Sequence, residues 1–211
     1  MILECGRSFI CSQLWCDFVS PVINKYPTNA ELCKCCLSII LNMNVHNESR
    51  KVLLQQNYLP LLLTISNYCQ KDSEVIALTL QVIRSICSAE RILDSSRFTY
   101  PIEESYDLVI RHNTISYIIM NLMSHPMDVA ICTQGTRALE WIIKTGGMQI
   151  VKSLIDEGTF DVCIDILQNH DDIDLVNGVS RLLIKIIRSS SAFFFYYLMN
   201  RVRRLLRFLS L

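Results

Sequence analysis

Apolar residues recur at every third or fourth position along most of this chain, and short polar breaks separate the periodic segments. In the segment 74–88, Val75, Leu78, Val82 and Ile86 form one apolar stripe at helical spacing, and a second apolar stripe lies beside it. A helix with so wide an apolar arc is buried on most of its sides, and only a narrow polar strip remains for solvent. The pattern therefore predicts helices that pack against several neighbours.

Four long helices of this kind are predicted. Their bounds are Ala30–Met43, Glu74–Ser88, Val129–Thr145 and Asp174–Ser189, and Leu37, Leu80, Leu139 and Leu183 are aligned at one shared position. Residues that commonly cap helix N-termini precede them: Thr28 with Glu31 as a capping box, Asp72 or Ser73, Asp128, and Asp171 or Asp172. Gly146-Gly147 is predicted to end the third long helix.

A second pattern recurs where shorter helices meet: two apolar residues, two polar ones, Asn or Gly, a variable residue and an apolar residue. It occurs at Leu53–Leu59, Val109–Ile115 and Leu154–Phe160. Asn and Gly tolerate the left-handed conformation that ends many helices, so Asn57, Asn113 and Gly158 are predicted to separate one helix from the next. The interval of 45 residues from Asn113 to Gly158 is typical of helical repeats, whereas the 56 residues from Asn57 to Asn113 predict a loop insertion at 90–106.

The segment 49–63 resembles the first and second helices of an armadillo repeat, and 36–43 resembles its third helix. The resemblance covers roughly residues 1–190 and implies an all-α fold, a right-handed α-solenoid of about four repeats with a C-terminal helix. The expected units of this single domain (1–211) are a partial repeat at 1–45, repeats at 46–89, 90–145 and 146–191, and the C-terminal helix at 192–211. HEAT repeats are the alternative, and the short first helix favours armadillo.

The resemblance also implies a function, since third helices of armadillo repeats line a concave groove that binds an extended peptide or a partner protein. The predicted groove residues are Lys34, Ser38, Asn42, Gln81, Arg84, Ser85, Thr136, Glu140, Lys144, Ser180 and Arg188. In importin-like members a ladder of Trp and Asn lines the groove. Asn42 matches the Asn position, but other residues occupy the Trp positions, so binding of nuclear-localisation signals is not expected. The predicted function is a non-enzymatic protein–protein interaction scaffold.

Composition narrows the class of partner. The 20 basic and 20 acidic side chains balance, so an overall basic field for nucleic acid is absent and no nucleic-acid partner is expected. Hydrophobic residues make up 51% of the chain and exclude a disordered protein. The ten cysteines lie mostly in apolar helical runs, as small hydrophobes do, which favours a reducing compartment, the cytoplasm or the nucleus. The high apolar content also indicates self-association or membership of a longer solenoid.

Cys33, Cys35 and Cys36 are the strongest candidates for a metal site. On one helix they spread over about 300°, at roughly 100° per residue, so they cannot converge on a tetrahedral ion without further ligands. His170 with its two following aspartates is interpreted as a turn between helices. No catalytic residue, metal or cofactor is therefore predicted, and a zinc-binding or enzymatic helical domain stays as the alternative of another class.

The C-terminal segment 192–211 is apolar first and then basic. It carries Arg201, Arg203, Arg204 and Arg207 among leucines. The preferred interpretation is a capping helix whose apolar face closes the stack while the arginines reach solvent. The alternative is an adaptor that uses this basic amphipathic helix to contact a membrane surface or an acidic partner.

Overall fold

The computed structural model describes residues 10, 13–44, 53, 56, 58–87 and 113–189, without the side chains of 145–149 and 189. The regular elements within these ranges are all helical, which confirms the all-α prediction for them. They are η1 (Leu14–Val19), α2 (Ser20–Lys25), α3 (Ala30–Asn44), α5 (Leu59–Tyr68), α6 (Ser73–Cys87), α8 (Thr114–Ser124), α9 (Val129–Asp156), α10 (Thr159–Asn169) and α11 (Ile173–Ser189). The expected loop at 90–106 and the C-terminal segment 192–211 lie outside the described residues.

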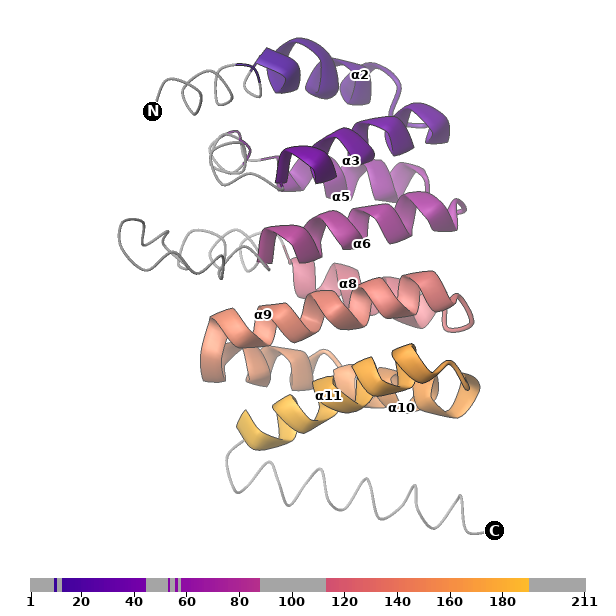
Figure 1. The fold of residues 1–211 in the computed structure, drawn as a ribbon, viewed down its shortest axis with the longest axis vertical. Coiled ribbons are helices and arrows are strands. Elements are labelled where there is room, and N and C mark those ends of the chain that lie inside the picture. The colour runs from indigo at the N-terminus through magenta and orange to yellow at the C-terminus, as the bar shows by residue number, and fades with distance from the viewer. Residues whose placement is uncertain are drawn as a thin grey trace.

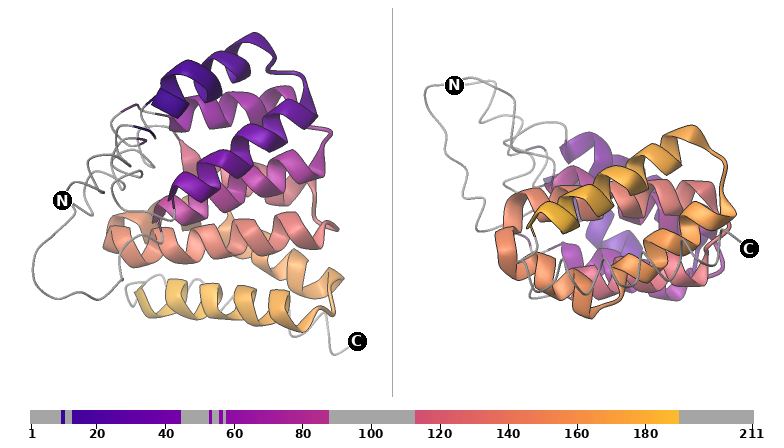
Figure 2. Two further views of the ribbon diagram at one scale, coloured as in Figure 1. Left: turned by 45° about the horizontal axis from the view of Figure 1, so that its top comes forward. Right: turned by 90° about the horizontal axis from the view of Figure 1, so that it is seen from below.

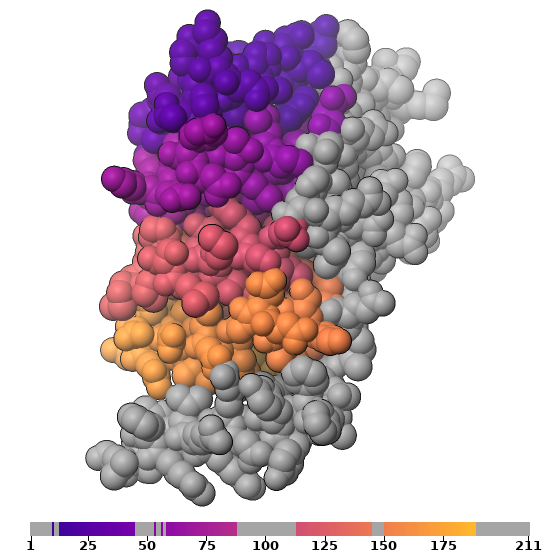
Figure 3. All heavy atoms as spheres, turned by 180° about the vertical axis from the view of Figure 1, so that it is seen from behind, coloured from indigo at the N-terminus to yellow at the C-terminus, as the bar shows by residue number. Residues whose placement is uncertain are grey.

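The helices form two layers. In one layer α3, α6, α9 and α11 lie side by side in chain order, each packed against the next (Figure 1). The other layer contains α2, α5, α8 and α10, and Figure 2 shows the two layers facing each other. From the side of this second layer, the chain appears as successive bands from the N-terminus to the C-terminus (Figure 3). Each helix pair therefore contacts mainly the pair before it and the pair after it.

The core runs between the two layers as one continuous cluster from Trp15 to Ile186. Leu37, Leu80 and Leu139, one from each of three successive long helices, are fully buried in it. Burying one such side chain contributes about 1.5–3 kcal/mol. Because these side chains are covered by neighbouring pairs as well as by their own, a single pair could not bury its apolar faces alone.

Left-handed residues separate successive helices at two predicted positions. Asn113 has φ 51° and precedes α8, and Gly158 has φ 81° and precedes α10. A Cβ atom added to Gly158 would meet nothing within 4 Å, so the backbone conformation, not the lack of space, favours glycine there. These two predictions are confirmed, whereas Asn57 lies outside the described residues.

Aspartates cap three of the long helices as predicted. Asp72 accepts hydrogen bonds from the N–H groups of Glu74 and Val75, both at 3.1 Å, and Asp128 accepts two at 3.0 Å. Asp172 accepts one at 2.8 Å from Leu175. These bonds satisfy N–H groups that have no partner within the helix.

At α3 the predicted capping box of Thr28 and Glu31 is wrong. Asn29 is the cap, because its side-chain oxygen accepts a hydrogen bond from the N–H of Leu32 at 3.2 Å and its carbonyl accepts one from Cys33. Glu31 instead points to Lys34, at 3.1 Å.

The four caps correct the alignment of the long helices. Measured from Asn29, Asp72, Asp128 and Asp172, Leu139 and Leu183 lie one helical turn further along than Leu37 and Leu80, so the predicted shared position is wrong. Two thiols verify the corrected alignment. Cys33 donates to the carbonyls of Tyr26 and Pro27, and Cys132 donates to those of His125 and Pro126.

Helix α9 continues beyond its predicted end at Gly146-Gly147, as far as Asp156. Glycine inside a helix costs about 1 kcal/mol relative to alanine, which buried Ile150 and Leu154 offset further along the same helix. The α9 ribbon turns back after its long first part (Figure 1), and glycine pairs are a known cause of sharp helix bends.

Candidate partner-binding surface

The predicted groove residues belong to α3, α6, α9 and α11, the helices that lie side by side in one layer. We call the solvent-facing side of these four helices the third-helix surface. Ser38, Asn42, Lys144 and Arg188 are exposed on it, and Lys34, Gln81, Arg84, Ser85, Glu140 and Ser180 are half-buried. Thr136 is only 1% exposed, and its hydroxyl donates to the carbonyl of Cys132 at 2.6 Å. Thr136 is therefore not accessible to a partner, because the corrected alignment places it with buried Leu37 and Leu80.

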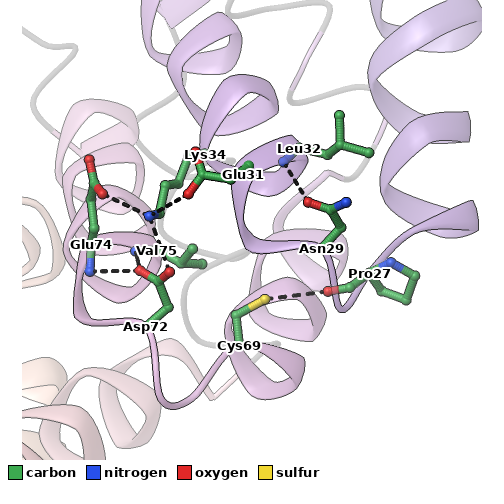
Figure 4. Close-up of polar contacts among 9 residues, drawn as sticks. All are labelled: Pro27, Asn29, Glu31, Leu32, Lys34, Cys69, Asp72, Glu74 and Val75. Carbon is green, nitrogen blue, oxygen red and sulfur yellow. Dashed lines mark hydrogen bonds and ion pairs between the residues drawn. The ribbon is translucent and has the colours of Figure 1, made fainter.

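Lys34 joins α3 to α6 through a cluster of carboxylates (Figure 4). Its Nζ lies 2.8 Å from Glu74, 3.1 Å from Asp72 and 3.1 Å from Glu31. Hydrogen bonds to Glu74, Glu31 and Asp72 raise the pKa of Lys34 above its ordinary value. Its side chain is 17% exposed, so this predicted groove lysine is engaged by its own chain.

The Asp72 carboxylate has two tasks in the same cluster, as the α6 cap and as a partner of Lys34. Burial acts to raise its pKa, but the N–H of Val75 and the ammonium of Lys34 outweigh burial, and the pKa of Asp72 is lowered. The cap thus also links two successive helix pairs.

A second set of ion pairs joins α9 to α11. We call the line along which two neighbouring helices of this layer pack a seam. Glu140 Oε1 lies 2.6 Å from Lys185 Nζ, and Glu140 Oε2 lies 3.8 Å from Arg181 Nε. Lys185 and Arg181 were not among the predicted site residues. Glu140 was, and its side chain is held by these two cations.

The seam between α6 and α9 differs from both. Arg84 on α6 and Arg137 on α9 lie on helices that pack against each other, and both side chains are half-buried. Burial and then the nearby Arg137 lower the pKa of Arg84. Neither arginine forms an ion pair within the described ranges. The sequence analysis missed Arg137 because it aligned Leu139 with Leu80, whereas alignment on Asp128 would have placed Arg137 with Ser38 and Gln81.

Two further contacts shape this surface. Lys144 Nζ lies 4.0 Å from the centroid of the Trp141 ring, a cation–π contact at the exposed edge of α9. Asn44 donates to the hydroxyl of Ser85 at 2.8 Å and so connects α3 to α6. Ser85 is therefore partly a structural residue.

The candidate metal cluster does not form. Cys33 and Cys36 are buried whereas Cys35 is exposed, and no group of three or more metal-ligating side chains occurs in the part of the chain that the structure describes. Burial, and then Cys69, raise the pKa of Cys33 to about 12, so its thiol stays protonated. Protonated thiols are poor metal ligands and poor nucleophiles.

His170 has a structural contact. Its Nε2 lies 2.6 Å from the carbonyl oxygen of Pro126, 44 residues earlier, and must donate the proton because a carbonyl can only accept. Cys69 makes the equivalent contact with the carbonyl of Pro27, 42 residues earlier, at 3.5 Å (Figure 4). Both contacts tie a turn to the corresponding turn of the preceding helix pair.

The candidate second surface, formed by Arg201, Arg203, Arg204 and Arg207, lies outside the described residues. Among the helices that the structure does describe, none combines the length and the apolar character that a membrane span requires.

Comparison of the chain with protein-family models, with curated proteins and with solved structures finds no match.

Proposed function

We propose that this protein is a non-enzymatic, armadillo-like scaffold that binds an extended segment of a partner protein along the third-helix surface. The observation that carries the proposal is the side-by-side packing of α3, α6, α9 and α11 in chain order, with polar side chains on their solvent-facing side. Such a layer offers a row of side chains at regular intervals, which suits an extended peptide.

Recurring contacts support the repeat architecture that this proposal assumes, a right-handed solenoid. Each long helix has an Asn or Asp cap, and Cys33 and Cys132 bind the same pair of turn carbonyls in their own units. The contacts of Cys69 with Pro27 and of His170 with Pro126 link consecutive units in the same way. Similar contacts at intervals of about one repeat length are expected when units of one kind are stacked.

A reducing compartment, the cytoplasm or the nucleus, belongs to the same proposal. Cys33, Cys36, Cys69, Cys132 and Cys163 are buried as free thiols, several of them donating hydrogen bonds to carbonyls. Buried free cysteines of this kind behave as small hydrophobes and need no oxidising environment.

The test is selection of short random peptides against the full chain, followed by affinity measurement by fluorescence anisotropy. Asn42→Ala and Gln81→Ala are each expected to weaken the selected peptide about threefold to tenfold, because each removes a polar contact from the third-helix surface. Neither change is expected to lower the melting temperature, since Asn42 is exposed and Gln81 half-buried.

The matched control is Asn67→Ala, because Asn67 is exposed on α5 in the other layer. It is expected to leave the affinity unchanged. If Asn67→Ala weakens binding while Asn42→Ala and Gln81→Ala do not, the partner binds the opposite face and the proposal fails.

A further inference from the structure

Arg84 and Arg137 lie where two neighbouring helices of the third-helix surface pack, and neither has an acidic partner among the described residues. Arg84 lies in the last turn of α6 and Arg137 in the middle of α9, two helices that pack closely against each other. Both side chains are half-buried. Neither makes an ion pair or a hydrogen bond with a carboxylate in the described ranges, and Arg137 is near enough for its charge to lower the pKa of Arg84.

The neighbouring α9–α11 seam shows that side chains at these two positions can reach each other. Counted from the helix caps, Glu140 on α9 corresponds to Arg84 on α6, and Arg181 on α11 corresponds to Arg137 on α9. Glu140 and Arg181 form an ion pair at 3.8 Å, so this backbone arrangement brings the two side chains within contact distance. At the α6–α9 seam the glutamate is replaced by an arginine, and the missing charge is one carboxylate.

Two partly desolvated cations on neighbouring helices repel each other, and the repulsion is stronger there than in bulk water. An anion between them would remove the repulsion and gain two charge-assisted hydrogen-bonding partners. The planar guanidinium group, with its forked donors, is the side chain best suited to bind a carboxylate in this way.

The surroundings add positive charge and leave little free negative charge. Lys144 stands over Trp141 further along α9, on the exposed edge of the same surface. Two carboxylates on the same helices are already engaged, Glu140 by Lys185 and Arg181 and Glu74 by Lys34. The net charge of the chain is zero, yet Arg84, Arg137 and Lys144 bring three cations to this surface on α6 and α9.

We propose that Arg84 and Arg137 form an anion subsite that takes the side-chain carboxylate of a glutamate or aspartate in an acidic peptide segment lying across the third helices. The inference rests on the proposed peptide-binding function and specifies the chemistry of one of its subsites. A polyanion such as single-stranded nucleic acid fits less well, because Glu31, Glu74 and Glu140 lie on helices of the same layer and the described part of the surface has only one arginine pair.

The first experiment measures binding of a fluorescein-labelled oligoglutamate to the full chain by anisotropy at low salt, with oligoglutamine and oligothymidylate as comparison probes. Oligoglutamate is expected to bind most tightly. Arg84→Gln and Arg137→Gln are each expected to weaken it about tenfold, whereas the matched control Arg181→Gln is expected to stay within about twofold, because Arg181 is already paired with Glu140.

A preference for oligothymidylate that both arginine variants abolish would overturn the peptide assignment. Equal binding of oligoglutamate and oligoglutamine would overturn the anion subsite. The failure of this inference can be told from failure of the proposed function: a selected peptide that depends on Asn42 and Gln81 but not on Arg84 leaves the surface in place and removes the subsite alone.

The second experiment needs no ligand. Arg84→Glu recreates at the α6–α9 seam the pair that Glu140 and Arg181 form at the α9–α11 seam. It is expected to raise the melting temperature by about 1–4 °C and to abolish the preference for oligoglutamate. An unchanged or lower melting temperature would show that the two arginines do not face each other closely enough to share an anion, and the inference would be overturned.

Discussion

The seams at the two ends of the third-helix layer differ from the seam in its middle. Between α3 and α6, Lys34 is surrounded by carboxylates, and between α9 and α11, Glu140 is surrounded by cations. The central residue is a cation at one end and an anion at the other, yet at each end the neighbouring side chains neutralise its charge. Between α6 and α9, Arg84 and Arg137 have no ion-pair partner among the described residues. The same helix packing thus accepts neutralised and basic seams.

This difference teaches that the charges do not hold the layers together. Ion pairs near a protein surface contribute about 0–1 kcal/mol, whereas each buried leucine contributes several times more. The apolar core is continuous through all three seams, and the middle one packs closely despite its repulsion. The charged residues at the seams can therefore differ from one seam to the next without changing the fold, which the apolar packing determines.

The largest expected effect comes from removing that packing. Leu80 on α6 is fully buried, and α6 borders two of the seams. Leu80→Ala is expected to lower the free energy of unfolding by about 2–5 kcal/mol, measured by urea denaturation. Met120→Ala, at a residue 65% exposed on α8, is the control and is expected to change it by less than about 0.5 kcal/mol. If Leu80→Ala lowers the free energy of unfolding less than the loss of an ion pair does, ion pairs and not apolar packing stabilise the layer.

A middle-sized effect separates capping from ion pairing. Asp72 and Asp128 cap equivalent helices, but the structure gives only Asp72 a lysine partner. Asp128→Ala is expected to cost about 0.5–2 kcal/mol and Asp72→Ala somewhat more. Equal losses in urea denaturation would show that Lys34 adds nothing at the α3–α6 seam.

The pH dependence gives this prediction a sign. The folded pKa of Asp72 is below its ordinary 3.8, so its contribution is fully present above that value and is lost as the pH falls through the folded pKa. The stability gap between the wild type and Asp72→Ala should therefore be constant from neutral pH to about pH 5 and close in more acidic solution. A gap that widens on acidification would contradict the assigned ion pair.

The smallest expected effect is at the α9–α11 seam. Glu140→Gln removes the charge that pairs with Lys185 and Arg181 and is expected to cost less than about 1 kcal/mol at low salt. The loss should disappear in about 1 M sodium chloride, where charges at this distance are screened. Measuring the urea midpoint at both salt concentrations tests it, and a loss that persists in salt would indicate packing instead of charge.

Much of the helical architecture could be predicted from periodicity and capping residues. Helix α6 was expected at Glu74–Ser88 and lies at Ser73–Cys87, and the left-handed residues Asn113 and Gly158 stand where the repeated motif placed them. Both signals are local, because a cap or a left-handed turn depends on a few neighbouring residues. That is why sequence alone was sufficient.

The errors arose where the outcome depends on distant groups. Helix α9 passes through Gly146-Gly147 because buried residues further on offset the cost of glycine, whereas the exchange of Thr28 for Asn29 as a cap is a local error of one residue. The site was affected most. An alignment on leucines instead of caps hid Arg137 and selected buried Thr136, and the partners of Lys34 and Glu140 lie on the next helix, where no local pattern can reveal them.

The side-by-side layer also sets the length and rhythm of any segment that crosses it. Packed helices lie about 8–10 Å apart, and an extended chain advances about 3.3 Å per residue. A segment that crosses from α3 to α11 therefore needs roughly 9 residues and meets a new helix at about every third one. In a bound segment, the residues that contact successive helices would be spaced about three positions apart, with the acidic residue near the centre.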